Sequence, residues 1–145
     1  MSEAYSTYAF EDLSCIIKHP SVGTFNPQGE GFGSITFAMS GDVTAHDVAA
    51  DSTVMISKMR VGNGTIAITT QQTSSLHQWL TKAYNYCMGA PSSEWAKTAI
   101  MANSPAMKVT HDCSGVSFQK RGDKPYQAQG QMITWTFMSA VMKEY

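Results

Sequence analysis

Charged residues are scarce in this 145-residue chain, where lysine, arginine, aspartate and glutamate fill 14% of the positions, against about 25% in a typical soluble domain. Ten basic and eleven acidic side chains leave a formal net charge of −1. This balance argues against a dedicated nucleic-acid-binding protein, which normally has a basic face. It also disfavours a free soluble monomer, so we expect other subunits to cover much of the surface.

Two further absences narrow the class of protein. Cysteine occurs three times, at Cys15, Cys87 and Cys113, with no CxxC pair, so we expect buried free thiols and no disulfide framework. No apolar run approaches about 18 residues, and the first residues, MSEAYSTYAFED, lack a basic segment followed by an apolar one. The sequence therefore predicts no membrane span and no secretory signal.

Groups of residues that could carry out chemistry are few, and the densest are His46–Asp47 and His111–Asp112–Cys113. Neighbouring residues of a strand point to opposite faces, so neither group converges on one atom, and a zinc site needs three or four ligands. The glycine-rich GEGFG at residues 29–33 does not open a helix, as a phosphate-binding loop would. We expect no catalytic site, no metal site and no cofactor, and therefore no enzyme.

Alternation of apolar and polar residues predicts a mainly β chain. The expected strands lie at residues 13–18, 34–40, 53–61, 65–72, 98–102, 107–113, 115–120 and 131–142. The GNG sequence at residues 62–64 predicts a hairpin that pairs the third strand with the fourth. Residues 41–52, GDVTAHDVAADS, have weak periodicity and predict a long loop or hairpin arm between the second and third strands.

One stretch has the periodicity of a helix. From Leu76 to Met88, apolar residues recur with the i, i+3, i+4, i+7 spacing of a single apolar stripe. Ser75 begins a candidate capping box and Gly89 is a candidate C-terminal cap, so we expect the one long helix at about residues 75–88. The pattern predicts a single domain over residues 1–145, mainly β, with two packed antiparallel sheets, as a sandwich or partly open barrel, flanked by this helix.

The segment DKPYQAQGQMITWTF, residues 123–137, joins an amide-rich stretch to the most pronounced strand of the chain. Ile133, Trp135 and Phe137 fall on one face of that strand, whereas Met132 and Thr134 fall on the other. The second face is too apolar for water and too small for a deep core, so we expect another protein or sheet to cover it. The glutamines suit either a ligand site or a subunit contact, and amides can pair across a contact without the desolvation cost of charges.

The strings HPSVG (19–23), GEGFGSITFAMSGD (29–42), HDVAADSTVMISK (46–58), QQTSSLHQWL (71–80) and GVSFQKRGDKPYQAQGQMITW (115–135) carry a resemblance. Over nearly its whole length the chain resembles the small tail tube proteins of contractile-tailed bacteriophages, whose fold is similar to that of the haemolysin-coregulated secretion tube protein. The resemblance implies rings of six copies that stack into a hollow tube in the virion tail, assembled in the host cytoplasm. It also implies sheath, baseplate and terminator proteins as partners, and a channel through which tape-measure protein and DNA pass without specific binding.

The same resemblance assigns roles to residues. The arm that reaches the adjacent ring is expected to use Thr44, His46, Asp47, Val48 and Asp51. The subunit interface is expected at Tyr126, Gln127, Gln129, Gln131, Met132 and Thr134. The lumen is expected to be lined by small polar residues opposite the apolar faces, namely Thr36, Ser40, Thr65, Thr69 and Thr136. Two alternatives stay open: a secretion-system-type tube protein, and a small β-barrel ligand-binding protein with a cleft under the helix.

Overall fold

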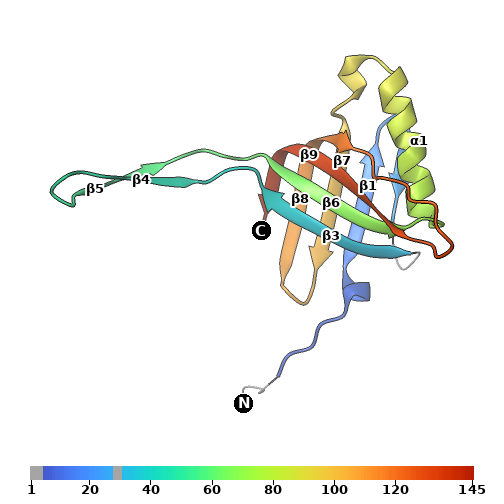
Figure 1. The fold of residues 1–145 in the computed structure, drawn as a ribbon, viewed down its shortest axis with the longest axis horizontal. Coiled ribbons are helices and arrows are strands. Elements are labelled where there is room, and N and C mark those ends of the chain that lie inside the picture. Colours follow the sequence, from blue (N-terminus) through green and yellow to red (C-terminus); the bar gives the residue numbers. More distant parts are fainter. Residues whose placement is uncertain (1–4, 28–30) are drawn as a thin grey trace.

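A curled β-sheet and one long helix form the body of the protein, and a β-ribbon projects from it (Figure 1). The computed structural model describes residues 5–27 and 31–145, so part of the GEGFG connection and the first four residues of the N-terminal segment lie outside the described residues. The elements are β1 (Ser14–His19), β2 (Gly23–Phe25), β3 (Phe32–Met39), β4 (Thr44–Val48), β5 (Val54–Lys58), β6 (Gly64–Gln71), α1 (Ser75–Gly89), β7 (Thr98–Ser104), β8 (Val109–Lys120) and β9 (Met132–Glu144), with 3-10 turns at Phe10–Asp12 and Ser92–Glu94.

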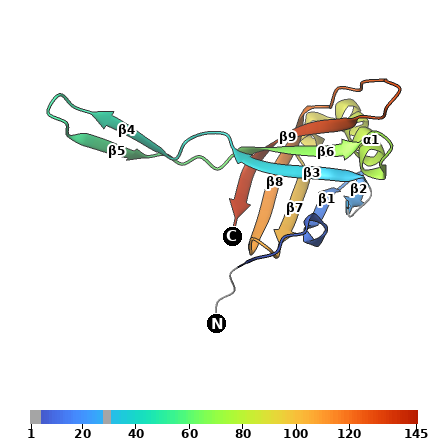
Figure 2. The same ribbon diagram turned by 60° about the horizontal axis from the view of Figure 1, so that its bottom comes forward.

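The seven strands of the body follow the order β2-β1-β7-β8-β9-β6-β3, and each neighbouring pair is antiparallel. Their sheet curls into half a barrel, with α1 on one side of it (Figure 2). The predicted mainly β fold with one long helix is confirmed. Of the two arrangements that the sequence left open, the structure has the partly open barrel, because β2 and β3 end the sheet without pairing with each other. The second, two-stranded sheet is the projecting ribbon of β4 and β5.

The pairing expected across GNG is wrong. β5 pairs with β4, from Thr44 opposite Lys58 to Val48 opposite Val54, whereas β6 pairs with β3 and β9. The predicted segment at residues 41–52 is therefore only the first strand and the turn of a longer ribbon, and residues 53–61 return along it. Gly64, the last residue of GNG, is instead the first residue of β6. A Cβ atom there would lie 2.5 Å from the carbonyl oxygen of Ala38 on β3. The glycine permits close approach of β6 to β3 and does not form a turn.

The helix lies where the sequence predicts it, but its ends differ in detail. The N-cap is Ser74, whose hydroxyl accepts a hydrogen bond from the His77 N–H at 3.1 Å, so the cap lies one residue before the predicted Ser75. Gly89 is the last helical residue, and the chain leaves the helix through Ala90 in an extended conformation, as the residue before a proline favours. In the described part of the chain, no helix is long and apolar enough to cross a membrane.

β8 merges the two strands expected at residues 107–113 and 115–120. Gly115 has a φ of +62°, and the register with β7 shifts between Thr98 and Ile100, which is the signature of a β-bulge. A Cβ atom at Gly115 would lie 2.8 Å from the Cβ atom of Ala140 on β9. Glycine therefore lets β8 bend and continue where a larger residue would collide with its neighbour.

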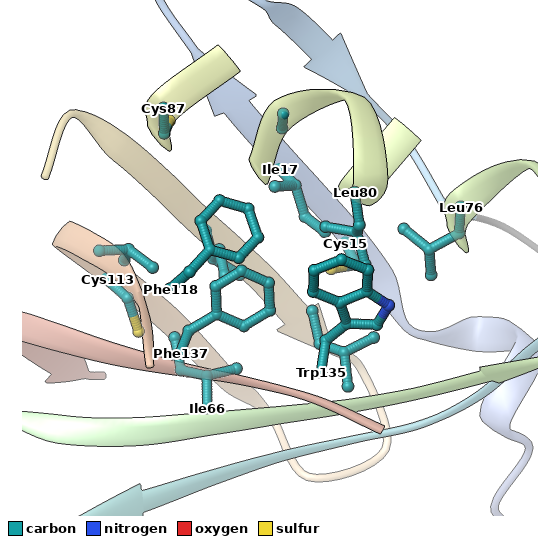
Figure 3. Close-up of a cluster of buried hydrophobic side chains, with 14 of the residues drawn as sticks. Cys15, Ile17, Ile66, Leu76, Leu80, Cys87, Cys113, Phe118, Trp135 and Phe137 are labelled. Carbon is teal, nitrogen blue, oxygen red and sulfur yellow. The ribbon is translucent and has the colours of Figure 1, made fainter. Parts of the chain in front are cut away.

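The core lies between the curled sheet and α1, and Figure 3 shows its central side chains. Trp135 of β9 is fully buried, and its ring packs edge-on against Phe118 of β8 at 5.7 Å and against Tyr84 of α1 at 6.1 Å between centroids. The indole N–H of Trp135 donates to Nδ1 of His77 at 3.1 Å. Because this bond satisfies the one polar group of the indole, the large ring is buried without leaving a polar group unpaired.

The predicted alternation along β9 is confirmed for most of the strand. The buried side chains are Ile133, Trp135, Phe137 and Ser139, and the exposed ones include Met132, Thr134, Met138 and Ala140. Val141, which the pattern places on the buried face, is exposed, and Met142 packs against the core in its place. The change of phase occurs opposite the bulge of β8, where Val141 pairs with Ser114.

Replacing Trp135 with alanine should lower the free energy of unfolding by about 3–5 kcal/mol, because it removes a fully buried aromatic side chain and leaves a cavity. Denaturant titration measures this loss. The matched control is Tyr126→Ala, which removes an aromatic side chain that is 88% exposed and should cost less than about 0.5 kcal/mol. Equal losses in the two variants would contradict the placement of Trp135 in the core.

Burial and, to a smaller extent, the charge of Lys124 lower the pKa of His77 below its ordinary value of 6.5. Below pH 6.5 the unfolded chain then binds more protons at this residue than the folded protein does. Stability should therefore fall as the pH drops through 6.5 and level off below the folded-state pKa. Protonation of Nδ1 also removes the acceptor of the Trp135 indole.

Thermal unfolding between about pH 7.5 and about pH 5 tests the role of His77. The variant His77→Asn keeps an amide oxygen as a possible acceptor for Trp135 but has no titrating group, so its melting temperature should depend less steeply on pH. The difference between the two proteins isolates His77 from the other histidines and the carboxylates. Identical slopes would show that His77 does not link stability to pH.

Candidate assembly surfaces

The two groups of residues considered for chemistry do not form sites. His46 and Asp47 are exposed on β4, far from the core. His111 stacks on Phe37 of β3, with ring centroids 4.2 Å apart, while Cys113 is buried in the core. Among the residues that the structure describes, no three histidine, cysteine, aspartate or glutamate side chains are grouped as a metal site requires.

The three cysteines are buried and free, as predicted. Burial, with a smaller contribution from Cys113, raises the pKa of Cys15 to about 12. Burial, followed by the charge of Asp112, raises the pKa of Cys113 to about 11, and burial likewise raises that of Cys87. These thiols stay protonated at neutral pH and are poor nucleophiles.

The first candidate surface is the arm, defined here as residues 40–63. It leaves the body where β3 ends and β6 begins (Figure 1), and every residue of β4 and β5 is exposed. Its tip is a formed turn: the Ala49 N–H donates to the Thr53 carbonyl at 2.8 Å, and the Asp51 carboxylate accepts from the Thr53 N–H at 3.1 Å. Hydrogen bonding from Thr53 also lowers the pKa of Asp51, so this carboxylate is ionised at neutral pH.

The ribbon of the arm has two different faces. Val48 pairs with Val54, and Ile56 follows two residues later on the same face; these three apolar side chains are 64%, 45% and 67% exposed, respectively. Asp47 and Met55 form a pair on the other face. Of the predicted arm residues, the structure places Thr44, His46 and Val48 on the apolar face, Asp47 on the opposite face and Asp51 in the turn.

The second candidate surface is the outward face of the sheet, which points away from the core. It comprises Ser34, Thr36 and Ala38 of β3, Thr65, Ala67 and Thr69 of β6, and Met132, Thr134, Thr136 and Met138 of β9. None of these side chains is charged. The hydroxyls of Thr69 and Thr134 lie 3.1 Å apart and form a hydrogen bond across the strands. The face therefore combines small hydroxyl side chains with the exposed Met132 and Met138.

The structure brings most of the predicted lumen residues together on this outward face. Thr36 aligns with Ala67 on β6, and Ala67 aligns with Thr136 on β9, while Thr65 and Thr69 lie on the same face of β6. Ser40 lies just past the end of β3, where its N–H donates to the Asn63 carbonyl at the base of the arm. Sequence reasoning had assigned Met132 and Thr134 to a separate subunit interface, but they share the outward face with the predicted lumen residues.

The third candidate surface is the loop at residues 121–131, which contains the other predicted interface residues. Gln72 anchors it: its side-chain oxygen accepts from the Gln131 N–H at 3.1 Å, and its side-chain amide donates to the Pro125 carbonyl. The Gln131 amide in turn donates to the Gln129 carbonyl at 3.1 Å and to the Gln127 side chain at 3.4 Å. Part of the amide hydrogen bonding predicted for a subunit contact therefore occurs within the chain, while Tyr126 remains exposed.

Sequence reasoning missed the basic residues at the start of this loop. We define the basic loop surface as Lys120, Arg121 and Lys124. The Arg121 guanidinium lies 5.7 Å from the ring centroid of Tyr84, and the Lys124 ammonium lies 5.7 Å from that of Trp135, distances at which cations are attracted to aromatic faces. The string KRGDK at residues 120–124 was the available signal, because three basic residues in five positions are unusual in so charge-poor a chain.

Two strands end the sheet and leave backbone groups without a strand partner. β2 has three residues, whereas β3 has eight and pairs along one side only, with β6. A long unpaired edge can add a strand from another chain, and proteins normally protect such edges. The outward face, the β3 edge and the arm are continuous with one another, because β3 carries residues of the face and leads directly into the arm.

Comparison with known structures identifies the same fold in tube proteins of contractile injection systems. The chain matches a chain of the PVC sheath–tube complex with a TM-score of 0.62 and 10% identity, over 98% of this chain and 93% of that one. A PVC sheath/tube terminator structure gives 0.64 and 10% identity, over 99% of both chains, and the anti-feeding prophage baseplate gives 0.63 and 11%, over 97% of both. At this identity the likeness shows the fold alone.

The comparison by sequence is more specific. No curated protein matches the chain. The profile of one family, described as bacteriophage PhiTE tail tube protein, matches residues 5–144. That range includes the arm, the outward face and the loop at residues 121–131. The chain therefore belongs to the bacteriophage PhiTE tail tube protein family.

Proposed function

We propose that this tail tube protein is the subunit of hexameric rings that stack into a hollow conduit for tape-measure protein and DNA in a contractile tail. Its family is one of structural tail proteins and not of enzymes, as the sequence predicted. The observation that carries the proposal is the arm, a ribbon whose strands are exposed along their full length and whose apolar face is left uncovered by its own chain. Exposed apolar surface of this kind marks a site at which another molecule binds.

The free edge of β3 supports the closure of rings. Eight residues of β3 have one unpaired side, and pairing this edge with a neighbouring subunit continues the sheet from one copy to the next. A closed ring leaves no edge exposed. The low charge of the chain fits a surface that neighbours bury on several sides, because burying an unpaired charge costs far more than burying an apolar or hydrogen-bonded group.

The outward face is the proposed lining of the channel. When edges of neighbouring subunits pair, this face becomes a continuous inner wall, and Thr36, Thr65, Thr69 and Thr136 then point into the lumen. Each contact between a cation and a phosphate adds affinity that depends on salt concentration, so DNA would be retained by a basic wall. A polar and uncharged wall lets DNA pass without binding.

Partners follow from the assemblies in which similar folds occur. The matched structures are a sheath–tube complex, a sheath/tube terminator and a baseplate. We infer that this protein likewise contacts sheath, terminator and baseplate proteins. A secretion-system-type tube remains the second candidate because it has the same architecture. A ligand-binding barrel is disfavoured because buried side chains of α1, among them Leu76 and Leu80, fill the space beneath the helix.

Removing the arm tests its role in stacking. Val43 and Met59 are joined by a backbone hydrogen bond of 2.9 Å at the base of the ribbon, so residues 44–58 can be replaced by an Asn-Gly turn. We expect the shortened protein to melt within a few degrees of the wild type and to form rings, but no longer to form tubes. Negative-stain microscopy shows both the tubes and the six-fold symmetry of end-on rings. Long tubes from the shortened protein would refute the arm assignment, and rings of another symmetry would refute the hexamer.

Cysteine labelling tests whether the outward face lines the lumen, because reagents of different size reach the lumen and the outer surface differently. In assembled tubes, Thr134→Cys should react with a small maleimide but not with one carrying a large polymer, because the polymer cannot enter the channel. Lys82→Cys, on an exposed position of α1, is the control and should react with both reagents. In unassembled protein the two variants should react alike. Equal reaction of Thr134→Cys with the large reagent in tubes would show that this face does not line the lumen.

A further inference from the structure

We propose that the tip of the arm docks on the basic loop surface of a second copy of this chain. The tip is defined here as residues 47–55, from Asp47 to its register partner Met55, and it contains Asp47 and Asp51. The basic loop surface is Lys120, Arg121 and Lys124, as above. The proposal rests on the proposed function of the arm as a link between rings, and it identifies what the arm binds.

The arm separates its charges along its length. Between residues 47 and 55 there are two aspartates and no lysine or arginine, whereas Asp42, Lys58 and Arg60 lie nearer the base. Asp47 is exposed on β4 opposite Met55. Asp51 is held in the turn by the Thr53 N–H. The tip is therefore acidic, and one of its carboxylates, that of Asp51, is held in a position that a partner can recognise.

The basic loop surface has the complementary charge. It holds three of the ten basic residues of the chain within five positions, and the one acidic residue among them is Asp123. In the part of the chain that the structure describes, the ion pairs join Glu94 to His19 and Lys97, and none involves the tip or the basic loop surface. Within the described residues, both charged regions therefore lack an ion-pair partner on another element.

The two regions cannot meet within one copy. The arm leaves the end of the sheet at which Met39 pairs with Gly64, whereas the loop at residues 121–131 joins the other end, at which Gln71 pairs with Met132. Figures 1 and 2 both show the ribbon and this loop, in orange-red beside α1, on opposite sides of the molecule. A contact between unlike surfaces at opposite ends joins copies head to tail and repeats without closing, as stacking requires.

The apolar face of the ribbon adds to this contact without deciding where it forms. Val48 and Val54 pair next to the turn that holds Asp51, and Ile56 follows on the same face, whereas Asp47 lies on the opposite face. Burial of the three apolar side chains provides attraction that has no preferred register. Complementary charges at an interface fix its register and exclude wrong partners. The aspartates therefore select the site, and the valines and isoleucine strengthen the contact once it has formed.

DNA phosphates are the competing partner for a basic surface, and the observations favour the arm tip. Asp123 lies in the middle of the basic cluster and repels phosphate. The neighbouring outward face is uncharged, so a passing duplex would meet three isolated cations. Asp123 repels the carboxylates of the tip as well, but the tip adds apolar side chains, Val48 and Val54, whose burial gives an attraction that a phosphate backbone lacks.

Charge reversal tests the docking. We expect Asp47→Lys with Asp51→Lys, and separately Lys120→Glu with Arg121→Glu, each to raise the protein concentration needed for tube formation by roughly tenfold or more, since like charges then face each other. All four substitutions in one chain should recover most of the assembly. The matched controls carry charge changes of the same size at exposed positions outside the arm and the basic loop surface, Glu11→Lys with Asp12→Lys and Lys82→Glu with Lys97→Glu, and should assemble as the wild type does. Sedimentation and microscopy measure tube formation.

A cysteine pair gives a direct measure of proximity. In assembled tubes, the double variant Asp51→Cys with Lys120→Cys should form disulfide-linked ladders of chains on mild oxidation. Either single variant, or Asp51→Cys combined with Lys82→Cys, should not. The natural cysteines are buried and have raised pKa values, so they do not compete.

The outcomes separate this proposal from the proposed function. If removal of residues 44–58 leaves tube formation intact, the arm does not link rings and both ideas fail. If that removal abolishes tubes while the charge reversals do not alter assembly and no ladder forms, only the docking site is wrong. If tubes of Lys120→Glu with Arg121→Glu form as the wild type does but no longer retain duplex DNA, the basic loop surface binds DNA and the docking proposal is wrong.

Discussion

The alternation of side chains along β9 is the constraint on which most of this structure depends. One face of the strand places Trp135 and Phe137 in the core, where the indole is closed in by Tyr84 and Phe118 and bonded to His77. Because the pleat has a period of two, burying this face fixes the other, which must point outward. β9 also pairs with both β8 and β6, so the same alternation aligns the outward-facing residues of its neighbours.

Two features of the sheet then determine what the outside of the molecule presents. The β3–β6 ladder ends at Met39 and Gly64, and the chain continues from both strands into the arm. At the opposite end, Gln72 follows β6 and holds the loop at residues 121–131 by three hydrogen bonds. The molecule therefore has unlike ends joined by a rigid sheet. This polarity suits a subunit that adds to copies of itself in one direction.

Much of the fold could be predicted from the sequence because the signals are local. The helical spacing from Leu76 onward, the period-two alternation along β9 and the strand patterns around Ile35 and Ile66 each depend on residues close in the chain. The pairing of strands could not be predicted in the same way. Residues 53–61 carry a strand pattern whether they join the body or an isolated ribbon, and GNG is as suitable for a turn as for close approach of two strands. Only the long-range contact of Gly64 with Ala38 distinguishes the two.

The sequence by itself indicated the family, through its resemblance to known tail tube proteins. It also predicted the mainly β composition and the buried free thiols, because composition and local periodicity decide these two properties. The tertiary structure decided which surfaces these residues form. It placed Met132 and Thr134 on the same face as the threonines of β3 and β6, used the Gln131 amide within the chain, and separated the acidic arm tip from Lys120 and Arg121 by the whole length of the sheet. These juxtapositions depend on strand order and register, which arise from packing between residues far apart in the chain and leave no local signal.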